Sequence, residues 1–194
     1  MNQRPNGSGD LEPLVADPNE TLDVEYKRWM DLRKPMHERR IARHICALAN
    51  HGGGYLVFGI DDDMTPSPAP PDSLEGYSHD IVNAIGRRHL IPQPHCDVRI
   101  VQLNGTAYPI VIVPPHGETP VSIRGAGSDD SAKGVRDGIV YIRAPGPCSI
   151  SIHEFPELWR PLIVRCHAAM VATLDADGDG ALSAAERGGA GASD

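Results

Sequence analysis

Residues 45–63 read ICALANHGGGYLVFGIDDD, and this stretch decides the fold. Its first part continues an apolar pattern at helical spacing that begins at Pro35, which predicts a helix over 35–50. The three glycines that follow predict the end of this helix, because glycine readily adopts the left-handed conformation of a helix C-cap. The apolar run at 55–60 then predicts a strand that is buried on both faces and leads directly into three aspartates.

The segments outside this stretch complete the prediction of an α+β fold. Upstream, the sequence LDVEYKR at 22–28 alternates apolar and polar residues, which predicts a half-buried strand with Glu25 and Lys27 on its polar face. Downstream, the pattern predicts a helix over 78–90, a hairpin that turns at Asn104-Gly105, a strand at 138–143 and a last helix over 153–174. Strands joined both by a helix and by a hairpin indicate a mixed sheet flanked by helices.

The composition along the chain divides it into three parts. Residues 1–19 are rich in Pro, Gly, Asn and acidic residues, and we expect them to form a flexible lead-in. Residues 20–152 hold the predicted sheet. Residues 153–194 hold the last helix and an end that is rich in acidic residues and glycine.

The charge and hydropathy of the chain exclude several classes of protein. Its 18 Lys plus Arg against 26 Asp plus Glu give a formal net charge of -8, so the chain does not hold polyanions by bulk charge. Its apolar runs are far shorter than the roughly 20 residues of a membrane span, so we expect no membrane partner. The first residues lack the apolar core of an export signal, and we therefore expect a cytoplasmic location.

The cysteines and histidines do not indicate a metal site. None of the four cysteines has the C-x-x-C spacing of zinc and redox motifs, so we expect reduced, mostly buried thiols. His37, His44 and His51 recur every seven residues on the predicted helix, roughly 10 Å apart, which is too far to share one ion. We expect these three histidines to lie on a solvated flank of the helix.

The first strand and helix carry a local excess of positive charge. Residues 24–43 hold seven Lys or Arg against three Asp or Glu, a local charge of +4 in an acidic chain. Such segregation predicts a surface that binds the phosphates of nucleic acid. A solvated helix face with ion pairs along the helix is the alternative. The candidate contact residues are Arg28, Arg39, Arg40, Arg43, Arg87, Arg88 and Arg143.

Three acidic residues are candidates for a metal site. Glu20 and Glu25 belong to the region of the first strand, and Asp62 follows the neighbouring strand, so we expect their carboxylates to meet. Such a cluster holds Mg²⁺ or Mn²⁺ for phosphodiester cleavage, while Lys27 takes the scissile phosphate. We expect strand-end carboxylates to contribute little to the core. The alternative is a solvated rim of acids.

Four stretches of the chain resemble the Schlafen-type AlbA domain, a family often described as DNA-binding. They are ExxxxEYK at 20–27, ICALANHGGGYLVFGIDDD at 45–63, PVSIR at 120–124 and GIVYIRAPG at 138–146, and the likeness extends over residues 20–165. In Schlafen relatives that cut transfer and ribosomal RNA, two glutamates of the first stretch and an aspartate after the second form a metal-dependent nuclease site. The resemblance implies that these are Glu20, Glu25 and Asp62 here, or Asp61 or Asp63 if the register differs.

The resemblance therefore implies a metal-dependent endoribonuclease that acts on structured RNA such as tRNA. Two departures from the family pattern weaken this implication. The usual D-x-G after the aspartates is replaced by Asp63-Met64-Thr65-Pro66. The animal nucleases use a pair of such lobes, so a single lobe implies a homodimer or a smaller substrate. A non-catalytic DNA- or RNA-binding module and a calcium-responsive interaction module are the alternatives.

Residues 175–186 read DADGDGALSAAE and match the EF-hand calcium loop. The alternating acids, the glycine at the turn and the final glutamate supply oxygen ligands at the spacing that Ca²⁺ needs. The predicted ligands are Asp175, Asp177, Asp179, the Ala181 carbonyl, Ser183 through water, and Glu186. Gly188-Gly189 cuts the exiting helix short, and the sequence has no second loop to pair with this one, so we expect weak binding.

Overall fold

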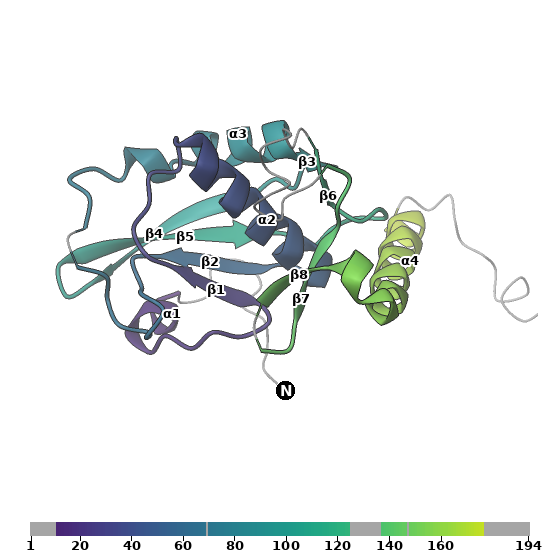
Figure 1. Ribbon diagram of the computed structural model, residues 1–194, viewed down its shortest axis with the longest axis horizontal. Coiled ribbons are helices and arrows are strands. Elements are labelled where there is room, and N and C mark those ends of the chain that lie inside the picture. Colours follow the sequence, from purple (N-terminus) through teal and green to yellow (C-terminus); the bar gives the residue numbers. More distant parts are fainter. Residues whose placement is uncertain (1–10, 69, 125–136, 147, 177–194) are drawn as a thin grey trace, which may run out of the picture.

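The computed structural model describes residues 11–68, 70–124, 137–146 and 148–176 (Figure 1). Its main sheet has four strands in the order β1-β2-β5-β4. These strands are β1 (Val24–Lys27), β2 (Gly54–Phe58), β4 (Asp97–Leu103) and β5 (Thr106–Val113). β1 and β2 are parallel, whereas β2–β5 and β5–β4 are antiparallel, so the sheet is mixed, as the sequence predicts.

The parallel pair is joined by the helix α2 (Pro35–His51), which confirms the predicted helix. Pro35 opens the helix at a position where no intrahelical partner is lost through its missing N–H. Gly52 ends the helix with a φ of 118°, and the amides of Gly52 and Gly53 both donate to the Leu48 carbonyl oxygen. The chain then passes directly into β2.

Helices cover both faces of the main sheet (Figure 1). α2 and α3 (His79–His89) pack on one face, where apolar residues of β2 are fully buried, and a single 3-10 turn, η1 (Glu75–Tyr77), precedes α3. The short helix α1 (Pro13–Ala16) lies against the other face, where its Val15 is buried. The segment 1–19, predicted to be a flexible lead-in, therefore includes a packed helix.

β4 and β5 form the predicted hairpin. Asn104 and Gly105 have positive φ values of 50° and 79°, which the two-residue turn of a tight hairpin requires. The pair Leu103–Thr106 closes the ladder next to this turn. The position of the turn in the sequence prediction is confirmed.

Two smaller sheets pack beside α2. In these sheets β3 (Leu90–Ile91) pairs with β6 (Ser122–Ile123), and β7 (Tyr141–Ala144) pairs with β8 (Cys148–Ser151). The fully buried side chain of Asn50, at the end of α2, donates to the carbonyl oxygens of Val121 and Tyr141 at 2.7 and 2.8 Å. Asn50 thereby links α2 to both of the later segments.

The end of the described chain differs from the single helix predicted over 153–174. Two 3-10 turns, η3 (Ile152–Glu154) and η4 (Pro156–Leu158), come first, and α4 (Trp159–Ala176) follows. Phe155 interrupts the helix with φ -134° and ψ 75°, because the residue before a proline is disfavoured in the helical conformation. α4 extends away from the sheet, with Leu162 buried at its base (Figure 1). Within the described ranges no helix is long and apolar enough to cross a membrane.

The four cysteines are all free thiols. Cys46 and Cys96 are buried, Cys166 is partly exposed and Cys148 is exposed. Burial raises the pKa of Cys46 and of Cys96 to about 12, which keeps these two thiols unreactive. The expectation of mostly buried thiols is therefore confirmed for Cys46 and Cys96 and wrong for Cys148.

Candidate functional site

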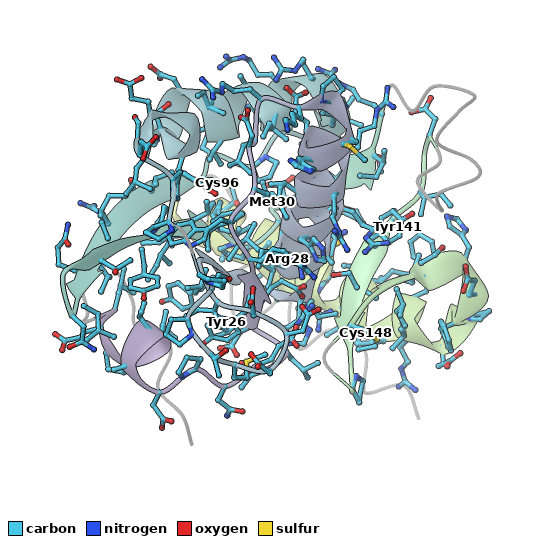
Figure 2. The ribbon with its side chains drawn as sticks, turned by 60° about the vertical axis from the view of Figure 1, so that its left-hand side comes forward. Tyr26, Arg28, Met30, Cys96, Tyr141 and Cys148 are labelled. Carbon is cyan, nitrogen blue, oxygen red and sulfur yellow. The ribbon has the colours of Figure 1, made fainter. Side chains whose placement is uncertain are left out.

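β1 places Glu25 inside the protein. Alternate residues of the strand face the core beside α1, whereas Glu25 and Lys27 face α2. α2 and the β7–β8 hairpin cover that side, and Glu25 is only 4% exposed. The prediction of a half-buried strand with a solvated polar face is therefore wrong for Glu25. Figure 2 shows this region, with Tyr26 on β1 and Cys148 on the hairpin labelled.

The carboxylate of Glu25 is bound by two cations. The side chain of Arg143, which is fully buried, donates from Nη1 to Oε2 of Glu25, and Lys27 donates to Oε1. The same guanidinium donates to the Thr21 carbonyl oxygen at 2.9 Å and to Oε1 of Glu20 at 3.4 Å. Because Arg143 belongs to β7, these contacts join β7 to the edge strand β1.

His44 of α2 also contacts Glu25. Its Nδ1 lies 3.3 Å from Oε1 of Glu25 and 3.2 Å from Oγ of Ser149. His44 is buried, which corrects the expectation that it lies on a solvated helix flank. Burial lowers the pKa of His44 to about 4, although the neighbouring Glu25 acts in the opposite direction, so His44 is neutral at pH 7. We call Glu20, Glu25, Lys27, His44 and Arg143 the β1 charge network.

The two glutamates of the network have pKa values that shift in opposite directions. Burial opposes the charge of Glu25, but the hydrogen bonds and charges of His44, which is protonated at the low pH where Glu25 titrates, and of Lys27 outweigh burial and hold the pKa of Glu25 well below its usual range. Burial raises the pKa of Glu20, and the charge of Glu25 raises it further, against the opposing effect of Arg143. Glu20 therefore takes up a proton before Glu25 as the pH falls.

Asp62 does not join the two glutamates. It follows the carboxyl end of β2, whereas Glu20 precedes the amino end of β1, so in this parallel pair the two residues belong to opposite ends. The side chain of Asp62 is 88% exposed, and its Oδ2 lies 3.7 Å from the Arg28 guanidinium. The expectation that these carboxylates meet is therefore wrong.

Neighbouring aspartates do not replace Asp62. Asp61 and Asp63 accept local hydrogen bonds from the hydroxyls of Ser67 and Thr65. In the part of the chain that the structure describes, no group of three His, Cys, Asp or Glu side chains is placed to hold a metal ion. Both oxygens of Glu25 already accept from cations, so in this arrangement the carboxylates do not fit a Mg²⁺ or Mn²⁺ site.

Five of the predicted arginine contacts lie on two adjacent helices. Arg39, Arg40 and Arg43 fall on one side of α2, and Arg87 and Arg88 lie at the end of α3. α3 packs beside α2, where Arg88 Nη2 lies 2.7 Å from Oε1 of Glu38. Arg40, Arg87 and Arg88 are exposed, and Arg39 and Arg43 are partly exposed. We call these five residues the α2–α3 arginine surface.

Arg28 and Arg143 lie apart from this surface. Arg28 is exposed at the carboxyl end of β1. The side chain of Arg143 is 0% exposed, which corrects the prediction that it contacts nucleic acid. The physical reason is that β7 is covered on both faces, with Tyr141 packed in the core of α2 and Ile142 packed in the core at the base of α4.

Sequence reasoning missed two buried polar residues of α2. His44 contacts Glu25, and Asn50 binds the later segments of the chain. Both lie in a part of α2 where residues 44–50 are all buried. A polar side chain within a run of small and apolar residues is the signal that identifies such positions, because a buried polar group needs a partner.

The predicted calcium ligands fall mostly outside the described residues. Asp175 lies in the last turn of α4. Asp177, Asp179, Ala181, Ser183 and Glu186 are not among the residues that the structure describes. The calcium loop therefore stays a prediction from the sequence.

Comparisons with known proteins bear on residues 20–149. Over this range, which is more than half of the chain, the sequence matches the profile of the family described as Schlafen, AlbA_2. No curated protein matches the chain. Among solved structures, the N-terminal domain of an ATP-dependent DNA helicase RecG-related protein from Nitrosomonas europaea is 23% identical with a TM-score of 0.43, over 60% of this chain and 79% of that chain. The DIP2311 protein from Corynebacterium diphtheriae is 18% identical with a TM-score of 0.49, over 77% of this chain and 27% of that chain.

Proposed function

Because the chain belongs to the Schlafen AlbA_2 family, we propose that residues 20–149 form a nucleic-acid-binding domain whose phosphate contacts come from the α2–α3 arginine surface. Membership of the family supports nucleic acid as the partner. The distribution of charge supports the location of the contacts. Arginine suits this role because its planar guanidinium donates several hydrogen bonds to phosphate oxygens.

The observation that carries this proposal is the concentration of arginine on two packed helices. α2 and α3 together hold the five arginines of the surface, and their acidic residues are Glu38 and Asp80. The whole chain has a formal net charge of -8, so the rest of the molecule is strongly acidic. A polyanion is repelled by that remainder and attracted to this one surface.

Two charge-matched double variants test the location. Arg40→Glu with Arg87→Glu reverses two exposed charges of the surface, whereas Arg99→Glu with Arg160→Glu reverses two exposed charges elsewhere. Both variants change the net charge equally, so bulk charge does not explain a difference between them. We expect the first to bind RNA and DNA more weakly, with a salt dependence lower by about two phosphate contacts, and the second to bind like the parent. Equal affinities of the two variants would place the contacts elsewhere.

A metal-dependent endoribonuclease is the second candidate, favoured by the convergence of Glu20, Glu25 and Lys27. The carboxylate oxygens of Glu20 and Glu25 are engaged by Arg143 and Lys27, so this activity requires the β1 charge network to rearrange when RNA and metal bind. Mg²⁺ or Mn²⁺ would then be the cofactor, held by Glu20 and Glu25, with Lys27 on the phosphate; Asp62 lies at the other end of the strand pair and is not one of these ligands.

Incubation of the pure protein with total transfer RNA and Mn²⁺ or Mg²⁺, with EDTA as the control, tests the nuclease. Glu20→Gln is the informative variant, because the side chain of Glu20 is 29% exposed and lies 3.4 Å from Arg143. Glu25→Gln is less informative, because it also disturbs a buried ion pair. Discrete fragments that need the metal and disappear in Glu20→Gln support the enzyme. Retention of RNA without cutting supports the binding module alone.

Two further features remain proposals from the sequence. We propose that a single lobe forms a homodimer to enclose a structured RNA or else acts on a smaller substrate, and sedimentation of the protein with and without transfer RNA measures whether a dimer forms. The EF-hand pattern at 175–186 supports Ca²⁺ as a ligand of the segment that follows α4, and a calcium-responsive interaction is the function that it would add.

A further inference from the structure

A pocket of about 320 Å³ lies beyond the carboxyl ends of the parallel strands β1 and β2. Its walls come from the loop that joins β1 to α2, which includes Trp29 and Arg33, and from the segment before α3, which includes Gly76 and Tyr77. Small-molecule pockets span roughly 300–1,000 Å³, so this one suits a single ring system. Loops at the carboxyl ends of parallel strands are the usual place for ligand sites in sheets that helices cover.

Trp29 is held firmly in the wall of this pocket. Its indole stacks on Tyr108 of β5, with centroids 5.9 Å apart and planes at 24°, and meets the ring of Tyr77 edge-on at 6.2 Å. Its Nε1 donates to the Ser67 carbonyl oxygen at 3.2 Å. A Cβ on Gly59 would overlap the indole, so glycine allows the backbone to pass against the ring. Trp29 therefore offers the pocket a fixed apolar surface whose one polar group is already satisfied.

The polar groups of the pocket lie at its rim. The Tyr77 hydroxyl donates to the Met30 carbonyl oxygen at 2.7 Å and accepts from the Met30 amide at 3.0 Å, so both of its roles are used. Asp31 and Arg33 form an ion pair, with Arg33 Nε 2.9 Å from Oδ1 of Asp31. This exposed pair offers both an acceptor and donors. A ligand with a flat ring and polar groups at the edge of that ring would match this pocket, which has aromatic side chains in its wall and the Asp31–Arg33 pair at its rim.

The pocket is lined by the segment that leads into α2, the helix that carries three arginines of the α2–α3 arginine surface. Residues 28–34 run from β1 to α2, and Figure 2 labels Arg28 and Met30 on this segment. Arg28 precedes Trp29 in the sequence, and its side chain is 68% exposed, 3.7 Å from Oδ2 of Asp62. Met36 is 61% exposed and lies one helical turn before Arg40, on the same side of α2. Aromatic, apolar and cationic groups are therefore adjacent along one stretch of chain.

We propose that this pocket takes one unpaired nucleobase of a single-stranded nucleic acid, stacked on Trp29, while the α2–α3 arginine surface holds the neighbouring phosphates. The proposal rests on the proposed nucleic-acid-binding function and names the form of nucleic acid that the domain selects. Stacking accepts any base, and the Asp31–Arg33 pair contacts the edge of the base. The domain therefore prefers unpaired segments to a continuous duplex and discriminates weakly between bases.

Fluorescence provides a direct test, because the chain has two tryptophans and Trp159→Phe leaves Trp29 as the reporter. In this background we expect a single-stranded oligoadenylate to quench Trp29 when a base stacks on the indole. The matched probe has the same length and charge but abasic sites in place of the bases. We expect it to bind at least about fivefold more weakly and to leave the fluorescence unchanged. If both probes bind with equal affinity and neither quenches Trp29, the pocket is not the nucleobase site, but the proposed nucleic-acid-binding function still stands.

A pocket-filling variant provides the second test. A Cβ on Gly76 would meet no atom closer than 4.0 Å, so the fold tolerates Gly76→Leu while the new side chain fills the pocket. Gly117→Leu is the control, because a Cβ there meets nothing within 4 Å and the residue is remote from the pocket. We expect Gly76→Leu to lose the preference for the base-containing probe and Gly117→Leu to keep it. If both variants keep the preference, the pocket is not the base site. If the parent binds neither probe nor transfer RNA, the proposed function fails as well.

Discussion

Arg143 and Glu25 are separated by 118 residues in the sequence, yet each neutralises the other inside the protein. Taking two charges out of water is costly, and their attraction offsets that cost only when the remaining donors and acceptors are also satisfied. Arg143 meets this condition, because it also donates to the carbonyl oxygens of Thr21, Leu22 and Val24. The residue fixes how β7 meets the edge of β1 and is not available to a ligand.

We expect Arg143→Met to lower the free energy of unfolding by about 3–5 kcal/mol, because Glu25 would lose a buried cation. Arg28→Met is the matched control. Arg28 lies 3.7 Å from Asp62 on the surface, where losing an ion pair costs at most about 1 kcal/mol. Urea denaturation measures both losses. Similar losses in the two variants would mean that Glu25 does not depend on Arg143.

His44 makes stability depend on pH within a defined window. Its pKa falls from 6.5 to about 4 on folding, chiefly through burial, so between these values the unfolded chain binds more protons than the folded one. The contribution of neutral His44 to the free energy of unfolding is therefore fully present above pH 6.5. It is lost as the pH falls from 6.5 toward about 4. We expect the urea midpoint to drop between pH 7 and pH 5 and to drop less in His44→Gln. His95→Gln, at an exposed site, should drop like the parent, and an equal drop in all three proteins would assign the effect to other groups.

At the scale of elements, the sequence predicts α2, β2 and the β4–β5 hairpin because local patterns determine them. Helical spacing, consecutive glycines and an Asn-Gly turn each act within a few residues. The failures depend on contacts between distant segments. The alternation in β1 indicates a solvated face, but Glu25 is buried because cations from β1 and β7 meet it. Asp62 stays apart from Glu20 because the crossover through α2 makes β1 and β2 parallel.

The candidate site shows the same division. The arginines of α2 and α3 are predictable, because charge segregation along a helix is a local pattern. The burial of Arg143 is not, because nothing within GIVYIR distinguishes an inward arginine from an outward one. Trp29 also lacks a local signal, because its stacking partner Tyr108 comes from β5, and the close approach of Gly59 comes from the end of β2.

Gly54, the third of the consecutive glycines and the first residue of β2, has a role that the turn pattern does not reveal. A Cβ on Gly54 would overlap the carbonyl oxygen of Asp23, which accepts a hydrogen bond from the Tyr55 amide at 2.7 Å. Gly54→Ala must push β1 away from β2, and we expect it to cost about 1–3 kcal/mol of unfolding free energy. Gly117→Ala, at an open site, should unfold at the same urea concentration as the parent. Equal midpoints for both variants would show that β1 has room to move.

For the whole molecule, the arrangement of charge matters more than its sum. A chain of net charge -8 binds nucleic acid only where its cations gather, so the α2–α3 arginine surface and the acidic remainder together restrict how a polyanion approaches. Because the attraction is screened by salt, we expect affinity to fall steeply as ionic strength rises.

We expect the intact chain to bind Ca²⁺ with a dissociation constant on the order of 10⁻⁴ M, weaker than the ~10⁻⁷–10⁻⁵ M of paired sensor loops. The reason is that the loop at 175–186 has no second loop in the sequence and a short exiting helix. Ca²⁺ should win over Mg²⁺, because a flexible loop that ends in a bidentate Glu186 does not offer compact octahedral geometry. Calorimetry on the intact chain and on Glu186→Gln decides the matter. If Ca²⁺ binding to the intact chain releases no heat, or if the intact chain and Glu186→Gln give the same heat, residues 175–186 are an acidic tail and not a calcium site.

A ribosome delivers this chain in order, and the core cannot be completed until late in that order. The side chain of Asn50 is satisfied by Val121 and Tyr141, which are 71 and 91 residues further along. Arg143, which neutralises Glu25, is 118 residues further along than Glu25 and is synthesised later still. Until those residues emerge, Asn50 lacks its two carbonyl partners and Glu25 lacks its buried arginine, so both side chains resist burial. The nascent domain thus remains open to chaperones and proteases until β7 has been synthesised.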